Sequence, residues 1–333
     1  MTAARPLSMS YVLPIKRGRD GTAADAKTAE LVAYLTWLTT ELDDVIVVDG
    51  SPPDVFDNLS GVLPPVLRHL PPDAPGRSAM GKVDGVLTGL RHATEDRVLI
   101  ADEDVRYDGE ALRRMFTLLE TADIVRPQNY FSPAPWHALW DTSRSLLNRL
   151  TGGDWPGTMG VRRSVAMKQG GYDGDVMFEN LELERTVLAA GGRATVPLDL
   201  YVRRLPPSTG QFLSQRVRQA YDELARPRRL LIQLMILPAT LVVRRNPLAL
   251  AVAAAGVVVA AEAGRRRAGG TRYFSPFASL VAPLWLLERG VCAWLALGAQ
   301  LMFGGIPYRG RIVPRAANSM STLRRRMIAA QAA

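Results

Sequence analysis

The sequence has few of the residues that cross-link a fold or bind zinc. It contains one cysteine, Cys292, and three scattered histidines, His69, His92 and His137. A single cysteine excludes a disulfide within the chain and a thiolate metal site. The separated histidines also argue against a histidine zinc site. Neither a disulfide scaffold nor a zinc centre is therefore expected.

The N-terminal segment lacks a long apolar core, so it does not resemble a secretory signal. Nor does any uninterrupted apolar stretch reach the ~20 residues of a simple membrane span. Four shorter stretches occupy residues 230–243, 248–261, 274–287 and 290–304. We expect the N-terminal part of the chain to remain in the cytosol.

Lysine is scarce, and the formal net charge of +9 comes from arginine. Arginine clusters lie at residues 226–229, 244–245, 265–267 and 324–326, and the first three flank apolar stretches. Positive charge beside apolar segments is typical of a cytoplasmic membrane face. Nucleic-acid binding would favour basic residues interleaved with aromatics, a pattern that the sequence lacks. We expect a membrane partner and no nucleic-acid partner.

Two interpretations of the four apolar stretches remain open. They form a buried helical subdomain, or they attach the chain to a bilayer as a short hairpin, re-entrant helices or interfacial helices. We favour attachment, because four apolar stretches bordered by arginines exceed what this small domain could bury. The expected location is the cell membrane, with the preceding domain facing the cytoplasm.

The first two-thirds of the chain alternate short apolar runs with amphipathic ones. Strands are predicted at residues 10–13, 44–48, 97–101 and 122–125, and helices at 23–42, 80–92, 108–119, 180–190 and 209–221. Uniformly apolar strands alternating with helices predict an α/β fold with a mostly parallel sheet flanked by helices. Residues 127–178 break the alternation. We predict a first domain at 1–225, apolar helices at 226–305 and a basic tail at 306–333.

Acidic residues follow two of the predicted strands, where ligands bind in open α/β sheets. Asp49 follows one strand, and Asp102-Glu103-Asp104 follows another. Two carboxylates spaced as in Asp102 and Asp104 can bind Mg²⁺ or Mn²⁺ together with a diphosphate. The alternatives are a solvated acidic turn for the triplet and a turn or capping residue for Asp49.

One ordered set of short motifs runs through the first two-thirds of the chain. The set consists of Tyr11-Val-Leu-Pro-Ile15, Val47-Val-Asp-Gly-Ser51, Gly81-Lys82, Leu99-Ile-Ala-Asp-Glu-Asp104, Gly160-Val-Arg-Arg163, Phe178-Glu-Asn-Leu-Glu182 and Gln215-Arg-Val-Arg-Gln219. In this order the motifs resemble family 2 of the glycosyltransferases, which has the GT-A fold, and the resemblance covers roughly residues 9–222. Membrane-bound members that act on lipids, such as ceramide glucosyltransferases, share the late Gln-x-x-Arg motif and resemble this chain most.

The resemblance implies a role for particular residues. The residues implied in nucleotide-sugar binding are Pro14, Asp49, Lys82, Asp102, Gln215 and Arg218. Asp102 and Asp104 would hold the metal, Mg²⁺ or Mn²⁺. Gln215 and Arg218 would face the diphosphate or the acceptor end of the cleft, where a guanidinium contacts phosphate oxygens well.

The chain departs from the family's pattern at two positions. Asn180 stands where the family usually has its catalytic aspartate, and an amide cannot accept the proton of a hydroxyl. We therefore predict Glu179 as the base, with Asp173 and Asp175 as alternatives. Gln219 replaces the tryptophan of the Gln-x-x-Arg-Trp motif, which argues against a processive, polysaccharide-extruding enzyme.

These inferences predict an inverting glycosyltransferase. It would move a sugar from a nucleotide sugar, UDP-linked by family habit, to a hydroxyl of a lipid or lipid-linked acceptor. A second possibility is transfer to polyprenyl phosphate, which needs no base. The third is a non-catalytic membrane scaffold that retains the fold.

Overall fold

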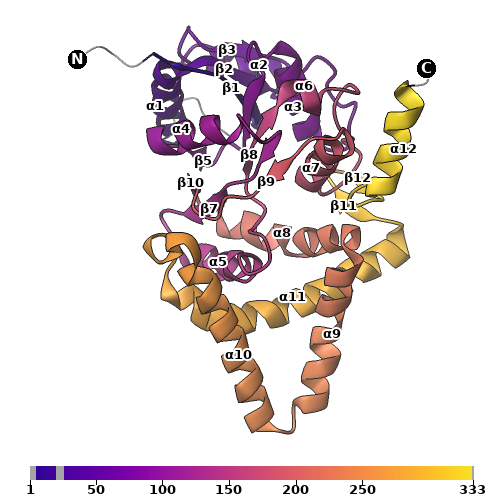
Figure 1. The fold of residues 1–333 in the computed structure, drawn as a ribbon. Helices are drawn as coiled ribbons and strands as arrows, with labels where there is room; N and C mark the ends of the chain where they lie inside the picture. Colours follow the sequence, from indigo (N-terminus) through magenta and orange to yellow (C-terminus); the bar gives the residue numbers. More distant parts are fainter. Residues whose placement is uncertain (1–4, 20–25, 332–333) are drawn as a thin grey trace.

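A seven-stranded sheet forms the centre of the structure, a computed structural model that describes residues 5–19 and 26–331 (Figure 1). In spatial order its strands are β3 (Arg68–Leu70), β2 (Leu42–Asp49), β1 (Leu7–Ile15), β4 (Arg97–Ala101), β8 (Thr158–Arg162), β6 (Ile124–Val125) and β9 (Ala194–Thr195). The first four are parallel to their neighbours, and β8 runs antiparallel to β4 and β6. The prediction of a mostly parallel α/β sheet is confirmed. The segment predicted to be irregular supplies the antiparallel strand β8.

Both faces of the sheet are covered by helices, which explains the uniformly apolar strands. Tyr11 and Leu13 of β1 pack toward α1 (Ala26–Glu41) and α4 (Gly109–Leu118). Val12, between them, points to the opposite face, toward α3 (Gly81–His92) and α7 (Glu179–Ala189). Burying each such apolar side chain stabilises the fold by about 1.5–3 kcal/mol.

Helix α3 lies unusually close to the sheet. A Cβ atom at Gly89 would stand 2.2 Å from Val12 Cγ1, so only glycine fits at this contact. The close packing fixes the first turn of α3, with Lys82, beside the carboxyl end of β1. The predicted helix at 80–92 and strand at 97–101 are confirmed, with the helix starting one residue later.

Smaller elements connect the sheet to a lower helical layer. A three-stranded sheet contains β5 (Val105–Arg106), β10 (Tyr201–Arg204) and β7 (Gln128–Phe131). The remaining helices before residue 226 are α2 (Pro53–Ser60), α5 (Trp136–Asn148), α6 (Arg163–Ala166), α8 (Thr209–Tyr221) and the 3-10 helix η1 (Asp222–Ala225). The predicted helix at 209–221 is confirmed at both ends.

Two of the C-terminal apolar helices project away from the sheet and meet at a turn (Figure 1). They are α9 (Pro227–Val243) and α10 (Pro247–Arg266), and the 3-10 helix η2 (Arg267–Arg272) leads from α10 to α11 (Pro276–Phe303). Helix α11 lies crosswise and packs against α5, α8, α9 and α10.

The two apolar stretches on either side of residues 288–289 belong to one continuous helix, α11. Both charged side chains turn toward the protein. Glu288 accepts hydrogen bonds from Arg216 and from Trp140, and Arg289 is 2% exposed. The charges therefore attach α11 to α5 and α8 and do not interrupt it.

By length and composition alone, two helical segments could cross a membrane. They are Pro247–Arg272, with mean hydropathy 1.8 and 11% of its most apolar window buried, and Pro276–Phe303, with 1.5 and 39%. Core helices of soluble proteins pass the same test. These helices are longer than the apolar stretches within them: α10 and α11 have 20 and 28 residues, whereas a simple span needs ~20 residues.

The segment predicted as a basic tail contains β11 (Ile306–Tyr308), β12 (Arg311–Val313) and α12 (Met320–Gln331), and it folds back against α7. Asn318 supplies the contact: its side-chain amide donates to Glu182 Oε1 at 2.8 Å. The division into three regions stays a prediction.

Candidate functional site

Two cavities open at the carboxyl edge of the central sheet, where β1, β2 and β4 end side by side. The β1–α3 cavity, of about 340 Å³, is lined by residues that include Pro14, Lys16, Gly50, Lys82 and Asp102. The α5–α8 cavity, of about 240 Å³, is lined by residues that include Asp102, Asp104, Glu179, Gln215, Arg218 and Asp222. Asp102 and Gln211 line both, so the cavities adjoin across these two side chains.

Asp102 is held between two cations. Its Oδ1 lies 2.6 Å from Lys82 Nζ, and its Oδ2 lies 3.3 Å from Arg204 Nη2. Its backbone N–H donates to the carbonyl of Gly157 at 2.7 Å. A Cβ atom at residue 157 would stand 2.7 Å from Asp102 Oδ2, so glycine allows this close approach. The carboxylate is therefore fixed in position from both sides.

Asp104 has one satisfied and one unsatisfied oxygen. Arg204 Nε donates to Oδ2 at 2.9 Å, whereas Oδ1 is buried and has no hydrogen-bond partner among the described residues. Burial raises the pKa of Asp104, the charge of Arg204 opposes this, and the charge of Asp102 adds to it. A buried oxygen without a partner is costly unless a cation or proton binds it.

Lys82 lines the β1–α3 cavity, and its ammonium group forms ion pairs with two acidic side chains that line the α5–α8 cavity. Its ammonium also lies 2.9 Å from Glu179 Oε1, at the first position of α7. Burial alone would lower the pKa of Lys82, but the negative charges of Asp102 and Glu179 raise it above its ordinary value. Lys82 therefore stays protonated and neutralises part of the acidic cluster.

A divalent cation would find an incomplete set of protein ligands here. Among the described residues, no group of three or more histidine, cysteine, aspartate or glutamate side chains gathers to hold a metal. Asp102 and Asp104 form a pair, and Asp104 Oδ1 is free to coordinate. The pair fits a Mg²⁺ or Mn²⁺ ion whose other ligands come from water and a diphosphate. Such an ion must compete with Lys82 and Arg204.

Asn180, at the position of the family's usual aspartate, has a structural partner. Its side-chain amide donates to the carbonyl of Pro156 at 3.2 Å, next to Gly157. An aspartate could not make this bond, because an ionised carboxylate only accepts. The asparagine therefore supports the loop that holds Asp102.

Asp173 and Asp175, the alternative bases, lie outside the linings of both cavities. Asp173 Oδ2 accepts from Asn318 Nδ2 at 2.9 Å and lies 3.3 Å from Arg326 Nη1. Asp175 Oδ1 accepts from the backbone N–H of Ala79 at 2.8 Å. Both carboxylates serve to attach neighbouring loops.

Asp49 is buried at the end of β2, and neither cavity's lining includes it. Its Oδ1 accepts from the backbone N–H of Ser51 at 2.8 Å, and its Oδ2 lies 3.3 Å from His69 Nε2. These contacts match the turn alternative. Asp49 orders the loop that presents Gly50 to the β1–α3 cavity.

Gln215 and Arg218 lie together on α8 and line the α5–α8 cavity, and the roles that the resemblance implies for them stay a prediction. The guanidinium carbon of Arg218 lies 5.2 Å from the ring centroid of Tyr308, a cation–π contact. Arg218 therefore shares one cavity with Asp102 and Asp104, whereas Asp49 does not.

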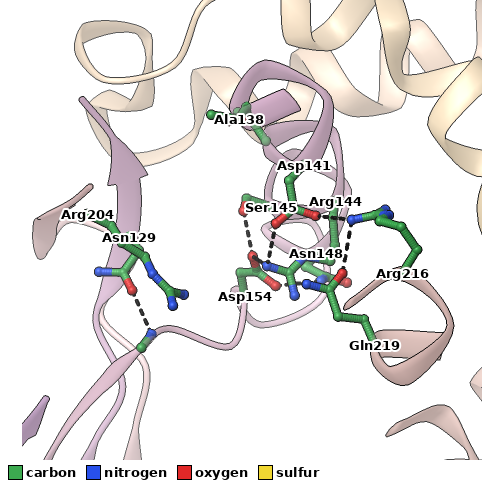
Figure 2. A network of polar contacts seen from close by, with 12 residues as sticks. Asn129, Ala138, Asp141, Arg144, Ser145, Asn148, Asp154, Arg204, Arg216 and Gln219 are labelled. Carbon is green, nitrogen blue, oxygen red and sulfur yellow. Dashed lines mark hydrogen bonds and ion pairs between the residues drawn. The ribbon is translucent and has the colours of Figure 1, made fainter. Parts of the chain in front are cut away.

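A polar network lies at the edge of the α5–α8 cavity, between α5 and α8 (Figure 2). Arg216 Nη1 lies 2.9 Å from Asp141 Oδ1, and Arg144 Nη2 lies 3.3 Å from both Asp141 and Asp154. Burial would raise the pKa of Asp141, but Arg144 and Arg216 lower it to about 2. The network fixes the position of α5 relative to α8.

Sequence reasoning missed Arg204, Asp141 and Asp222. Arg204 ends β10, which pairs with β5 immediately after Asp104, so its position depends on strand pairing far apart in sequence. Of these three residues, only Asp222 could have been found from the sequence. Gln215, Arg218 and Asp222 follow the i, i+3, i+7 spacing of one helix face.

Two of the tryptophans border the α5–α8 cavity region. Trp155 lines the cavity and packs under Arg126, whose guanidinium carbon lies 3.9 Å from the ring centroid. Trp136 is 58% exposed and contacts Phe212 and His137 edge-on. A further tryptophan, Trp140, donates to Glu288 at 2.9 Å and joins α5 to α11.

No family model matches the chain, and no curated protein matches it significantly. Solved structures similar to it include a mannosyltransferase from Pyrobaculum calidifontis in complex with GDP-Man and Mn²⁺. The two sequences are 16% identical, the match covers 99% of this chain and 82% of the mannosyltransferase, and the TM-score is 0.46. Mannosyl-3-phosphoglycerate synthase from Rubrobacter xylanophilus has 16% identity, coverages of 64% and 71%, and a TM-score of 0.43.

Glucosyl-3-phosphoglycerate synthase from Mycobacterium tuberculosis, in complex with Mn²⁺, UDP and phosphoglyceric acid, has 15% identity, coverages of 64% and 76%, and a TM-score of 0.40. At these values the likeness assigns neither a family nor a reaction to this chain.

Proposed function

We propose that the chain is a membrane-attached glycosyltransferase with the GT-A fold, transferring a sugar from a nucleotide sugar to a hydroxyl of a lipid or lipid-linked acceptor. The observation that carries the proposal is the position of Asp102. It lines both cavities at the carboxyl edge of the sheet, between Lys82 and Arg204. A diphosphate at this junction would place its nucleoside in one cavity and its sugar in the other.

The residue types of each cavity suit this division. The β1–α3 cavity offers Lys16 and Lys82 to a nucleoside diphosphate. The α5–α8 cavity offers carboxylates, glutamines and aromatic rings, the groups that bind hydroxyls and sugar faces. UDP is the nucleotide that the resemblance implies.

A divalent ion held by Asp102 and Asp104 would stabilise the charge that builds on the leaving diphosphate. Because Lys82 and Arg204 already neutralise these carboxylates, we expect the ion to bind only together with the nucleotide. Arg204 would then shift toward the phosphate oxygens, which a guanidinium binds well.

A hydroxyl acceptor is favoured over a phosphate acceptor. Glu179 and Asp222 both line the α5–α8 cavity, and their negative charges repel an anionic acceptor. A hydroxyl acceptor, in contrast, needs a carboxylate to take its proton.

The membrane part of the proposal is supported by exposed apolar side chains. On α10, Leu248, Val252 and Val259 are 73%, 63% and 68% exposed. On α11, one face is buried against the protein, and the opposite face carries Leu280 and Leu284, 62% and 55% exposed. Patches this extensive are typical of membrane or protein contacts.

Arginines lie at both ends of the α9–α10 hairpin, and their positive charges would attract anionic lipid headgroups. In this arrangement the hairpin enters the bilayer and α11 lies along its surface. The α5–α8 cavity, whose walls rest on α11, would then open close to lipid acceptors.

The test measures sugar transfer by the full chain in vesicles that contain total lipid extract. UDP- and GDP-sugars are supplied with Mg²⁺ or Mn²⁺, and products are identified by mass. We expect a glycosylated lipid from at least one donor. Glu179→Gln and Asp222→Asn, measured separately, should spare transfer if the acceptor is polyprenyl phosphate. Full activity in Asp104→Ala would contradict the metal role, and absence of nucleotide binding would favour a non-catalytic scaffold.

A further inference from the structure

Among the described residues, the carboxylate of Asp222 has no partner, and its place directly after α8, in the lining of the α5–α8 cavity, gives it a role. Resting on the proposed sugar transfer, we propose that Asp222, and not Glu179, takes the proton from the acceptor hydroxyl. Helix α8 presents a row of side chains to the cavity: Gln211, Gln215, Arg218 and, after its last turn, Asp222. Asp222 thus lies on the wall that also carries the diphosphate-side residues.

The contacts of the two candidate bases differ. Glu179 is committed to Lys82, with 2.9 Å between Oε1 and Nζ. Within residues 5–19 and 26–331, the Asp222 carboxylate makes no hydrogen bond or ion pair, although the side chain is only half-buried and reaches the cavity. A base must be free to receive a hydrogen bond from its substrate, and Asp222 is the carboxylate that meets this condition.

The charged groups around Asp222 come from four elements. Glu179 faces it from α7, Glu223 from η1, Arg226 from the start of α9, and Arg289 from α11. The two arginines have other partners: Arg226 pairs with Glu223 at 2.8 Å, and Arg289 donates to Gln219 at 3.4 Å. Neither makes an ion pair with Asp222.

These surroundings suit a base that works near neutral pH. Burial raises the pKa of Asp222 well above its ordinary value, the charge of Glu179 adds to the rise, and Arg226 opposes it. A carboxylate with a raised pKa is a stronger base than an ion-paired one, as long as it is ionised at the working pH.

The step balances without another reactant. The acceptor hydroxyl gives its proton to the Asp222 carboxylate while its oxygen forms a bond to C1 of the donor sugar. The bond between C1 and the diphosphate oxygen breaks, and the nucleoside diphosphate leaves with the electron pair. Asp222 then releases its proton to water.

The test compares Asp222→Asn with the unaltered protein in vesicles with lipid extract, using the UDP- or GDP-sugar that the unaltered protein transfers. We expect kcat to fall by about 10²–10⁴-fold, with the KM for the donor within about threefold. The rise of kcat with pH in the unaltered protein should disappear in the variant. Asp57→Asn, an exposed aspartate on α2, is the control for loss of one negative charge.

Two results would overturn the assignment alone: a kcat for Asp222→Asn within threefold of the unaltered protein, or an unchanged pH profile. Asp222→Glu should recover part of the activity, which a purely structural role does not predict. Calorimetry with UDP separates the two proposals. If the unaltered protein transfers no sugar and binds neither UDP nor GDP, the proposed function fails, and this inference fails with it.

Discussion

Lys82 Nζ lies 2.6 Å from Asp102 Oδ1, and this ion pair joins the first turn of α3 to the end of β4. The pair lies where the two cavities meet, so a bound diphosphate would contact both partners. Its strength depends on a close helix–sheet contact, because α3 can approach β1 only through glycine at residue 89.

Lys82→Met should weaken nucleotide binding in the absence of metal. The substitution keeps the length of the side chain but leaves Asp102 and Glu179 without their shared cation, so both repel a diphosphate. We expect the Kd for UDP to rise at least about tenfold, or about 1.4 kcal/mol, by calorimetry in EDTA. Lys168→Met, at an exposed lysine on the far side of α6, is the control. Equal affinities for UDP in the two variants would remove Lys82 from the site.

Gly157→Ala should damage both stability and binding. The new Cβ would stand 2.7 Å from Asp102 Oδ2 and 3.0 Å from Arg204 Cζ. We expect a loss of about 1–3 kcal/mol in the free energy of unfolding, measured with urea, and weaker nucleotide binding. Gly61→Ala is the control, because its nearest atom would be 3.6 Å away. An unchanged Kd in Gly157→Ala would show that Asp102 does not contact the ligand.

Asn180→Asp, which introduces the aspartate usual in the glycosyltransferase family that the motifs resemble, should not give a better enzyme. The carboxylate loses the hydrogen bond to the carbonyl of Pro156 and places two acceptors side by side. We expect about 1–3 kcal/mol of destabilisation at pH 7, decreasing in acid as the new carboxyl gains a proton. Higher activity in this variant at unchanged stability would mean that Asn180 is a lost base.

Asp222→Asn should stabilise the protein at alkaline pH. The folded-state pKa of Asp222 is raised by burial and by Glu179, so its stabilising contribution is complete below the unfolded pKa of about 3.9. That contribution is lost as pH rises through the folded pKa. We expect the variant to unfold with a free energy higher by on the order of 1 kcal/mol at pH 8 and equal near pH 4. The reverse dependence would show that Asp222 has a cationic partner.

Leu248→Glu combined with Val252→Glu should release the chain from membranes. Both side chains are exposed on α10, and each loses about 1.5–3 kcal/mol of burial in lipid. We expect flotation with phosphatidylglycerol-containing vesicles to fall at least about tenfold. Val66→Glu replaces a valine that is 78% exposed in the segment between α2 and β3 and should float normally. Undiminished flotation of the double variant would exclude α10 as the attachment.

The sequence predicted the parallel half of the sheet because its signals are local. Residues 98–101 are apolar on both faces of the strand, and β4 has the predicted bounds, 97–101. Strand β8 was not predicted from the apolar pattern, because Thr158 and Gly160 give a weak strand signal and β8 is defined by its pairing with β4. Only the resemblance of Gly160-Val-Arg-Arg163 to an acceptor-side strand indicated it. The length of α11 was missed because Glu288 and Arg289 resemble a break until their partners on α5 and α8 are known.

The candidate site was predicted where a motif fixes a position along one element. Asp102, Asp104, Gln215 and Arg218 share a cavity, as expected from their motifs. The contacts that decide their chemistry come from elsewhere in the chain: Arg204 arrives through the pairing of β10 with β5. The partner of Asn180 arrives through the loop before β8. Spacing along the sequence does not indicate these tertiary contacts.

The role of Asp102 in nucleotide binding is tested most directly by calorimetric titration of the full chain with UDP and GDP, with and without Mn²⁺, beside the variant Asp102→Ala. We expect at least one nucleotide to bind, more tightly with Mn²⁺, and at least about tenfold more weakly in Asp102→Ala. Binding that is unaffected by the loss of Asp102, or no binding of either nucleotide, would contradict it.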